Sequence, residues 1–187
     1  MMGEPHTAYE LAKWQGYATY AEVDAIHNLA GELSPDAIVV KIGAGAGTDT
    51  IAILEVMEDI VIFSIDIAAG EQPELTNEHL RLIENGYDKI GVVIRIWGDS
   101  KVVGKRWPLQ IDWLLVDGDH SLDGILGDIN AWKRHVKPGG LISFHDYGDP
   151  VWPAVKETVD MCMTDDTRLD EFSADHFISF RKEFDDS

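Results

Sequence analysis

Carboxylate and imidazole side chains gather where two apolar runs of the sequence end. One run ends in Asp-Gly-Asp-His at 117–120, and another ends in His145-Asp146. If the two runs are neighbouring parallel strands, their tips lie about 5 Å apart and these groups converge. Carboxylates that meet raise each other's pKa, and a divalent cation relieves the repulsion. The pattern therefore predicts a cation site at Asp117, His145 and Asp146.

The donor types narrow the choice of cation. Asp oxygens suit Mg²⁺, Ca²⁺ or Mn²⁺, whereas the nitrogen of His145 shifts the preference toward Mn²⁺, Fe²⁺ or Zn²⁺. The alternative is structural: Asp117 caps the following turn, and His145 packs against a neighbouring strand.

A glycine-rich turn follows the first apolar run of the central region. The run at 37–42 leads into Gly43, Gly45 and Gly47, and a helix-compatible segment starts at Thr48. This order predicts a buried strand, a tight glycine turn whose backbone a ligand can approach closely, and a helix whose N-terminus faces the ligand. The spacing G-x-G-x-G differs from the dinucleotide fingerprint G-x-G-x-x-G, so a nicotinamide cofactor is not favoured. A plain structural turn is the alternative.

Asp66 is the second residue that indicates a bound nucleoside. It ends the next apolar run, nineteen residues after Gly47. An acidic side chain at that strand tip can accept hydrogen bonds from the hydroxyls of a ribose. The alternative for Asp66 is a solvated residue at the end of a strand.

Short apolar runs and helical patterns alternate along the chain. Strands are predicted at 37–42, 60–66, 92–97, 111–117 and 141–146, with two closing strands near 168–172 and 176–181. Helices are predicted at 20–33, 48–58, 73–85, 99–107, 121–136 and 152–163. Such alternation predicts an α/β fold with a doubly wound, seven-stranded, mostly parallel sheet and helices on both faces. Ligands of such sheets bind beyond the carboxyl ends of the strands, where the polar residues gather.

Composition sets the class of protein. The chain has 187 residues, 45% of them hydrophobic, and its formal net charge is -19. This predicts one domain with a real core, and a field that repels nucleic acid. No apolar run approaches the ~20 residues of a membrane span, and no secretory signal is visible at the start, so a cytoplasmic protein without membrane partners is expected.

Five motifs in this order resemble one family. They are Val-Lys-Ile-Gly-Ala-Gly-Ala-Gly, Ser-Ile-Asp, Trp-Gly-Asp-Ser, Leu-Val-Asp-Gly-Asp-His-Ser and Lys-Pro-Gly-Gly-Leu-Ile-Ser-Phe-His-Asp-Tyr. Together they resemble a class I S-adenosylmethionine-dependent methyltransferase over about residues 37–160. The branch they resemble most is that of the small-molecule O-methyltransferases, which includes sugar, macrolide and catechol enzymes. The resemblance implies the Rossmann-like methyltransferase fold.

The resemblance also implies how S-adenosylmethionine is held. The glycines line its methionine and ribose part, the acid after strand two holds the ribose, the next residue covers an adenine face, and segment 99–100 lies at the adenine edge. The cofactor residues implied in this way are Lys41, Gly43, Gly45, Gly47, Asp66, Ile67, Asp99, Ser100 and Asp117.

The resemblance further implies a role for the acidic cluster. Asp117, His145 and Asp146 match the positions that bind a divalent metal, Mg²⁺ or Mn²⁺, in the metal-dependent members. There the metal holds the acceptor oxygens and favours their ionised form. Asp119 and His120 are the candidate catalytic bases, and the expected acceptor is a hydroxyl of a small molecule.

The implied domain has three parts: an N-terminal helical or lid segment at 1–36, a cofactor-binding core at 37–160, and closing strands and tail at 161–187. Self-association into a homo-oligomer is left open.

Two positions depart from the family pattern. Lys41 stands where the family usually has Glu or Asp, and that acid normally helps to hold the cationic methionine amine. His145 stands where a metal-binding acid is common. Lys41 keeps open a non-catalytic nucleoside-binding or degenerate methyltransferase-fold protein. The Asp/His cluster keeps open a metal-assisted hydrolase or lyase on the same fold.

Overall fold

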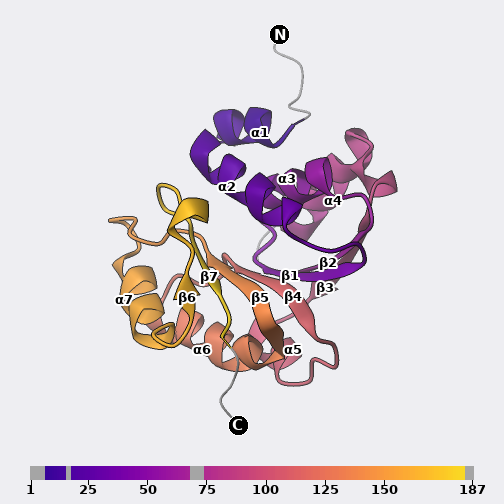
Figure 1. Cartoon of the computed structure of the whole chain (residues 1–187). Coiled ribbons are helices and arrows are strands. Elements are labelled where there is room, and N and C mark those ends of the chain that lie inside the picture. Colours follow the sequence, from indigo (N-terminus) through magenta and orange to yellow (C-terminus); the bar gives the residue numbers. More distant parts are fainter. Residues whose placement is uncertain (1–6, 16–17, 68–73, 184–187) are drawn as a thin grey trace.

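The computed structural model describes residues 7–15, 18–67 and 74–183. Across these residues one sheet has the strand order β3-β2-β1-β4-β5-β7-β6 (Figure 1). Its strands are β1 Ala37–Ile42, β2 Ile60–Asp66, β3 Val92–Trp97, β4 Ile111–Val116, β5 Val136–Phe144, β6 Thr167–Arg168 and β7 Ile178–Arg181. The helices are α1 Ala8–Gln15, α2 Tyr20–Gly31, α3 Thr48–Val56, α4 Glu74–Glu84, α5 Ser100–Gly104, α6 Leu122–Trp132 and α7 Pro153–Cys162. Short 3₁₀ helices are η1 Tyr87–Lys89, η2 Lys133–His135 and η3 Asp170–Phe172.

The sheet is parallel from β1 to β5, and β7 runs antiparallel to both of its neighbours. This confirms the predicted seven-stranded, mostly parallel α/β architecture. The chain leaves β1 on one side toward β2 and later returns on the other side as β4. The strand order therefore reverses between β1 and β4, and in sheets of this kind that point is where a crevice opens.

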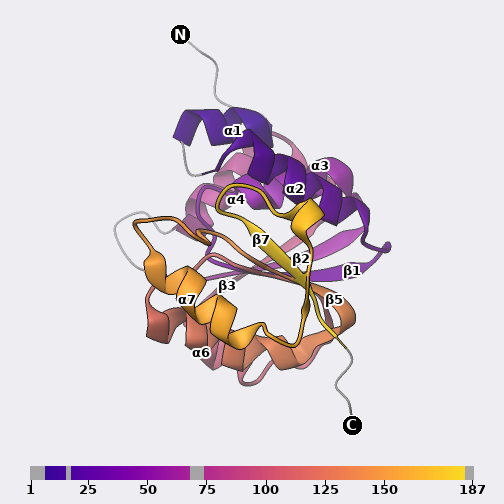
Figure 2. The ribbon, with the colours of Figure 1, turned by 60° about the vertical axis from the view of Figure 1, so that its left-hand side comes forward.

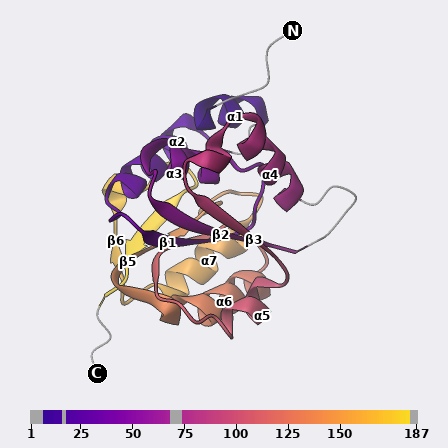
Figure 3. The same cartoon turned by 90° about the vertical axis from the view of Figure 1, so that its right-hand side faces the viewer.

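Helices cover both faces of the sheet. Helices α1 to α4 lie on one face and α5 to α7 on the other, as the three ribbon views agree (Figures 1, 2 and 3). Two buried apolar clusters fill the two layers, and alternate residues of one strand point into different clusters. Val39 belongs to the cluster under α1–α4, and Val40 to the cluster over α5–α7. Within the described residues no helix has the length and apolarity to cross a membrane.

A buried carboxylate ties α4 to the sheet. Glu78 is fully buried and accepts hydrogen bonds from the hydroxyls of Thr50 and Ser64. Its other oxygen lies 3.4 Å from Nε of Arg95 on β3. The network also lies against Gly47, where a Cβ would be 3.2 Å from Cγ of Glu78, and the φ of 87° at this position favours glycine as well.

The predicted boundary between α6 and β5 is wrong. The helix expected over 121–136 ends at Trp132, and a 3₁₀ turn follows. The Lys-Pro-Gly-Gly segment, expected to precede the strand, lies inside β5, which begins at Val136. The register between β4 and β5 shifts here, so the proline and glycines form an irregular stretch of strand instead of a loop.

The predicted closing strand at 168–172 is also too long. Only Thr167 and Arg168 pair with β7, and η3 follows directly. Leu169 turns into the core there, while Asp170 accepts a hydrogen bond from Arg168 at 2.6 Å. Residue 73, where the helix before β3 was expected to begin, lies outside the described residues.

Candidate functional site

The carboxyl edge of the sheet carries one large cavity of about 920 Å³. The residues predicted from the sequence that line it are Lys41, Gly43, Gly45, Asp66, Ile67, Asp99, Ser100, Asp117, Asp119, His120, His145 and Asp146. Gly47 lies behind the glycine turn, at the N-cap of α3, with its hydrogens toward Glu78. The residues singled out in the sequence therefore line one cavity. The contacts of each residue decide what it can do there.

The glycine turn is shaped by the close approach of β1 and β4. Gly43 has φ 87°, and a Cβ at this position would lie 1.9 Å from the carbonyl oxygen of Asp117. Glycine is the residue that fits both the left-handed backbone and this contact. Gly45 has φ 51°, and a Cβ there would meet nothing within 4 Å, so the top of the turn faces open space.

Asp66 holds the glycine turn as well as lining the cavity. Its Oδ2 accepts a hydrogen bond from the backbone N–H of Ala44 at 2.8 Å. Burial raises the pKa of Asp66 above its ordinary value, although the Ala44 hydrogen bond and the charge of Lys41 act in the opposite direction. The strand-tip acid is thus fixed to the turn that a ligand would contact.

Lys41 and Asp49 form a buried ion pair on the cavity wall. The ammonium of Lys41 lies 3.2 Å from Oδ2 of Asp49, and the two side chains are 1% and 6% exposed. Lys41 also donates to the carbonyl of Ala44 at 2.9 Å. Burial opposes the charge of Lys41, but Asp49 and other nearby carboxylates outweigh it and raise the pKa of the ammonium.

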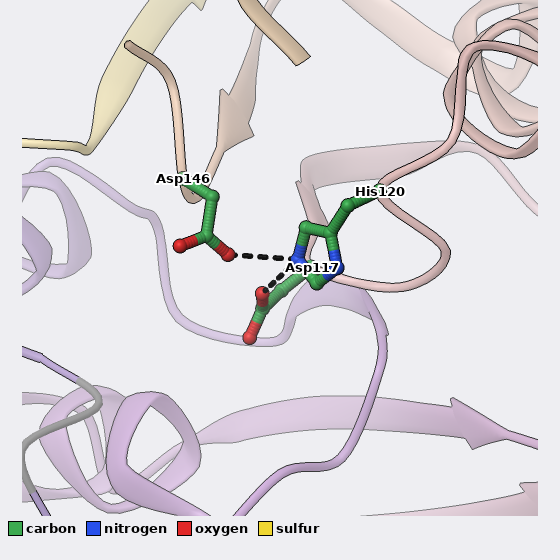
Figure 4. Close-up of side chains that lie close together, drawn as sticks. All are labelled: Asp117, His120 and Asp146. Atoms are coloured by element: carbon green, nitrogen blue, oxygen red, sulfur yellow. Dashed lines mark ion pairs between the residues drawn. The ribbon is translucent and has the colours of Figure 1, made fainter. Parts of the chain in front are cut away.

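Three side chains converge where β4 and β5 end, as Figure 4 shows. Ligand atoms of Asp117, His120 and Asp146 all lie within 4.8 Å of one another. Nε2 of His120 is 2.7 Å from Oδ2 of Asp146 and 3.6 Å from Oδ1 of Asp117. The two carboxylates, Asp117 first, raise the pKa of His120 to about 9. The imidazole is therefore a cation at neutral pH, held between two anions.

The backbone and an aromatic ring fix this cluster. Asp146 has φ 58°, the left-handed region that Asp tolerates better than most residues. Trp152, just before α7, stacks on the His120 ring with a centroid distance of 4.8 Å and an interplanar angle of 22°. Trp152 also lines the cavity, so its indole forms a wall beside the cluster.

His145 was expected beside Asp117 and Asp146, but it lies deeper, between Asp146 and Glu22 of α2. Nδ1 is 3.6 Å from Oδ2 of Asp146, and Nε2 is 3.7 Å from Oε2 of Glu22. Burial lowers the pKa of His145, but the surrounding carboxylates outweigh it and raise the value to about 10. The third member of the tight cluster is therefore His120, and His145 forms a buried cation behind it.

The cavity wall carries a second group of polar contacts. Asp99 caps α5 by accepting from the N–H of Lys101 at 2.8 Å, and the hydroxyl of Ser100 donates to Asp128. Asp119 is exposed, and its Oδ1 accepts from the N–H of Ser121 at 3.0 Å. That hydrogen bond lowers the pKa of Asp119, which makes it a weak base.

Asp128 is expected to cost stability at neutral pH. Burial raises its pKa to about 6, so the folded state holds a proton that the unfolded chain releases at lower pH. The free energy of unfolding therefore falls as the pH rises from about 4 to 6. Asp128→Asn removes this titration while its amide oxygen can still accept from Ser100. The free energy of unfolding of Asp128→Asn, taken relative to that of the parent, should therefore rise by about 1–2 kcal/mol between pH 5 and pH 8. Urea unfolding at the two pH values measures it.

Asp123→Asn is the matched control, since Asp123 is an exposed acid on the same helix. If the difference in the free energy of unfolding between Asp128→Asn and the parent does not change with pH, the pKa of the Asp128 carboxyl is not raised.

Sequence reasoning missed three buried acids at the site. Asp49 follows the glycine turn directly, Asp128 interrupts an otherwise apolar helix face, and Glu22 completes the capping box with Thr19 at the start of α2. A polar residue on an apolar face is a signal that the sequence did offer for Asp128. The capping role of Glu22 is visible in the pattern, but its contact with His145 is not, because 123 residues separate them.

Known proteins match this chain in both sequence and structure. The family described as "Methyltransferase domain" matches residues 40–147, more than half of the chain. Uncharacterized protein R132 of Acanthamoeba polyphaga mimivirus is 26% identical over 169 residues, which cover 84% of this chain and 76% of that protein.

Two solved structures show the same fold. The methyltransferase PaMTH1 of Podospora anserina, bound to SAH, superposes with a TM-score of 0.71 at 15% identity, covering 95% of this chain and 86% of that one. The O-methyltransferase TomG of Streptomyces achromogenes, in complex with SAM, gives a TM-score of 0.66 at 15% identity, covering 95% of this chain and 88% of that one. At these identities the likeness concerns the fold alone.

Proposed function

The chain belongs to the methyltransferase domain family, and from this membership we propose that it transfers the methyl group of S-adenosylmethionine to a hydroxyl of a small molecule. The observation that carries the proposal is one continuous cavity. Its glycine turn and Asp66 suit a nucleoside, and its Asp117–His120–Asp146 cluster suits proton removal from an acceptor.

The residues present fit the cofactor. Gly45 leaves the turn open toward the cavity, and Asp66 supplies a ribose acceptor at the tip of β2. Ile67 is 63% exposed and lines the cavity, so it is free to cover an adenine face. S-adenosylmethionine, when bound, supplies an electrophilic methyl group on a cationic sulfonium. The carboxylates of the cavity wall complement that positive charge.

His120 is the proposed proton acceptor. Transfer of a methyl group to a hydroxyl oxygen releases the hydroxyl proton, and only the neutral form of the imidazole can take it. Because the pKa of His120 is raised to about 9, this neutral form is the minor one at neutral pH, and its share grows as the pH rises toward 9. Asp146 and Asp117 orient the ring and stabilise the imidazolium that results. Trp152 restrains the ring from one side, so the imidazole cannot rotate freely. Asp119 remains a candidate base by position, but its carboxylate is engaged with the backbone N–H of Ser121.

The acceptor itself is proposed to lack anionic groups. Seven Asp residues line the cavity, against two lysines and the two histidines: Asp49, Asp66, Asp99, Asp117, Asp119, Asp128 and Asp146. This wall opposes the entry of phosphate groups, which also argues against nucleic acid as the acceptor.

The cofactor assignment is tested by calorimetry with S-adenosylhomocysteine. We expect micromolar binding, and Asp66→Ala should weaken it by about 1–3 kcal/mol through loss of charge-assisted hydrogen bonds. Asp59→Ala is the matched control, because Asp59 is an exposed acid just before the other end of β2. No heat with the parent protein at millimolar ligand would refute the proposal.

A divalent cation is proposed to assist the reaction, held by Asp117 and Asp146 with His120 or His145 nearby. Carboxylate oxygens suit Mg²⁺ or Mn²⁺, and the cation would supply positive charge that favours an ionised acceptor oxygen. We expect chelation to lower turnover on a catechol or sugar acceptor by at least about tenfold, and Mg²⁺ or Mn²⁺ to restore it.

Asp117→Asn should lose this metal response. Turnover that survives both chelation and this substitution would mean that the chain works without a metal.

A further inference from the structure

Glu22, in the first turn of α2, is a buried carboxylate that the proposed proton transfer does not use. Its side chain is 2% exposed, and among the described residues it is not part of the cavity wall. Withdrawal of a carboxylate from water opposes folding, and an apolar residue of similar volume is often at least as stable in such a place. The contacts of Glu22 therefore decide whether its charge serves the fold alone or the site as well.

A chain of ion pairs leads from Glu22 to the proposed proton acceptor. Oε2 of Glu22 lies 3.7 Å from Nε2 of His145, and Nδ1 of His145 lies 3.6 Å from Oδ2 of Asp146. The same oxygen of Asp146 lies 2.7 Å from Nε2 of His120 (Figure 4). Acidic and basic side chains thus alternate from the buried start of α2 to the imidazole in the cavity.

A peptide group gives Glu22 a second hold on the loop that follows β5. Oε1 of Glu22 accepts from the N–H of His176 at 3.0 Å, and the carbonyl of His176 accepts from the N–H of Tyr147 at 2.8 Å. The N-cap of α2, Thr19, also donates its hydroxyl to Asp175 at 2.6 Å. The start of α2 is therefore fastened both to the loop after β5 and to the turn before β7.

The two ends of the chain of ion pairs differ in how firmly they are held. Glu22 is fixed by the capping box, in which Oε2 accepts from the N–H of Thr19 at 2.7 Å and the N–H of Glu22 donates to the Thr19 hydroxyl at 3.2 Å. The carboxylate of Asp146 follows a left-handed backbone and contacts the rings of His120 and His145. A rigid acid behind His145 can therefore orient the acid in front of it.

We propose that Glu22 is a positioning residue of the reaction, which through His145 fixes the carboxylate of Asp146 where Asp146 orients His120. The proposal rests on the proposed function, in which His120 takes the proton. Proton transfer needs an acceptor within hydrogen-bond reach, and a displacement of about 1 Å can cost about 10²-fold in rate. Because Glu22 acts from behind the cavity wall, its loss falls on the rate and not on ligand binding.

Glu22→Gln tests the kinetic part. The amide keeps the length of the side chain and can still accept from His176, but it has no charge with which to hold His145. We expect kcat to fall about 10–100-fold, with the KM of the acceptor and the affinity for S-adenosylhomocysteine within about twofold of the parent. Steady-state kinetics with the catechol or sugar acceptor of the parent measure this. Asp24→Asn is the matched control and should behave as the parent, since Asp24 is an exposed acid of α2 that contacts Tyr9.

The ring of His120 reports the same coupling without turnover. ¹⁵N NMR records the imidazoles of the seven histidines, and His120→Ala assigns the signal of His120. At one fixed pH, Glu22→Gln should move this signal by more than its linewidth, although two side chains separate Glu22 from His120. Asp24→Asn should leave it in place. A role of Glu22 confined to the stability of α2 would change neither kcat nor this signal.

Glu22→Asp is the second variant, for the case in which Glu22→Gln does not fold. It keeps the charge but is one methylene shorter and withdraws from His145, so the same loss of kcat and the same movement of the His120 signal are expected. Parental kcat in a folded variant, or an unmoved His120 signal, overturns the inference. A parent protein that transfers no methyl group refutes the proposed function instead, and the His120 signal alone then decides whether Glu22 orients the cluster.

Discussion

Replacement of His120 by Ala is expected to lower methyl-transfer turnover by about 10²–10⁴-fold and to leave S-adenosylhomocysteine affinity within about twofold. The imidazole is the proposed proton acceptor, and its contacts are with Asp117, Asp146 and Trp152. Loss of the ring therefore removes proton transfer without removing a cofactor contact. The measurement is a single-turnover assay with a catechol or sugar acceptor, beside calorimetry with S-adenosylhomocysteine.

Asp119→Asn is the matched comparison, because Asp119 is the other candidate base on the same loop. Its carboxylate is exposed and engaged with the N–H of Ser121, so we expect a loss below about tenfold. The reverse order, a large loss at Asp119 and a small one at His120, would transfer the base to Asp119. A small loss at both would leave proton removal to solvent or to a metal-bound acceptor.

The sequence located this cavity because its signals are local. The glycine turn, Asp66 and the strand-end acids each follow an apolar run directly, and parallel strands bring such ends to one edge. The fold followed from the same alternation of strands and helices. Neither inference needed the direction of any side chain.

The identity of the third member of the acidic cluster, in contrast, depends on the direction in which a side chain points. Residues of a strand point alternately to opposite faces, so the residue two positions after Ser143 continues on its face. Ser143 accepts a hydrogen bond from Trp113, which belongs to the core under α1–α4. His145 continues toward that layer and meets Glu22 of α2. The left-handed backbone of Asp146 breaks the alternation and turns its carboxylate to His120.

The partner of Lys41 was hidden for a related reason. Lys41 is two residues after Val39, so it points into the layer of α3, where Asp49 occupies the first turn. The sequence shows a lysine in an apolar strand, which is a departure without an evident compensation. The compensating charge is that of Asp49 on α3, which packs against β1. The sequence alone does not show this contact.

Replacement of Gly43 by Ala is expected to lower the free energy of unfolding by at least about 3 kcal/mol, from backbone strain and overpacking together. Gly43 has φ 87°, and the added Cβ would lie 1.9 Å from the carbonyl oxygen of Asp117. That oxygen is backbone, so no side-chain movement relieves the contact, and β1 and β4 must separate. A domain with a total stability of about 5–15 kcal/mol loses much of it.

Gly45→Ala separates the contact from the backbone conformation. Gly45 has φ 51°, also left-handed, but its Cβ would meet nothing within 4 Å. The control should therefore cost only about 1–2 kcal/mol, the penalty of the left-handed region itself. Urea unfolding of both variants without ligand measures the difference. Equal losses would mean that backbone strain dominates, and that the approach of β1 to Asp117 is looser than the structure shows.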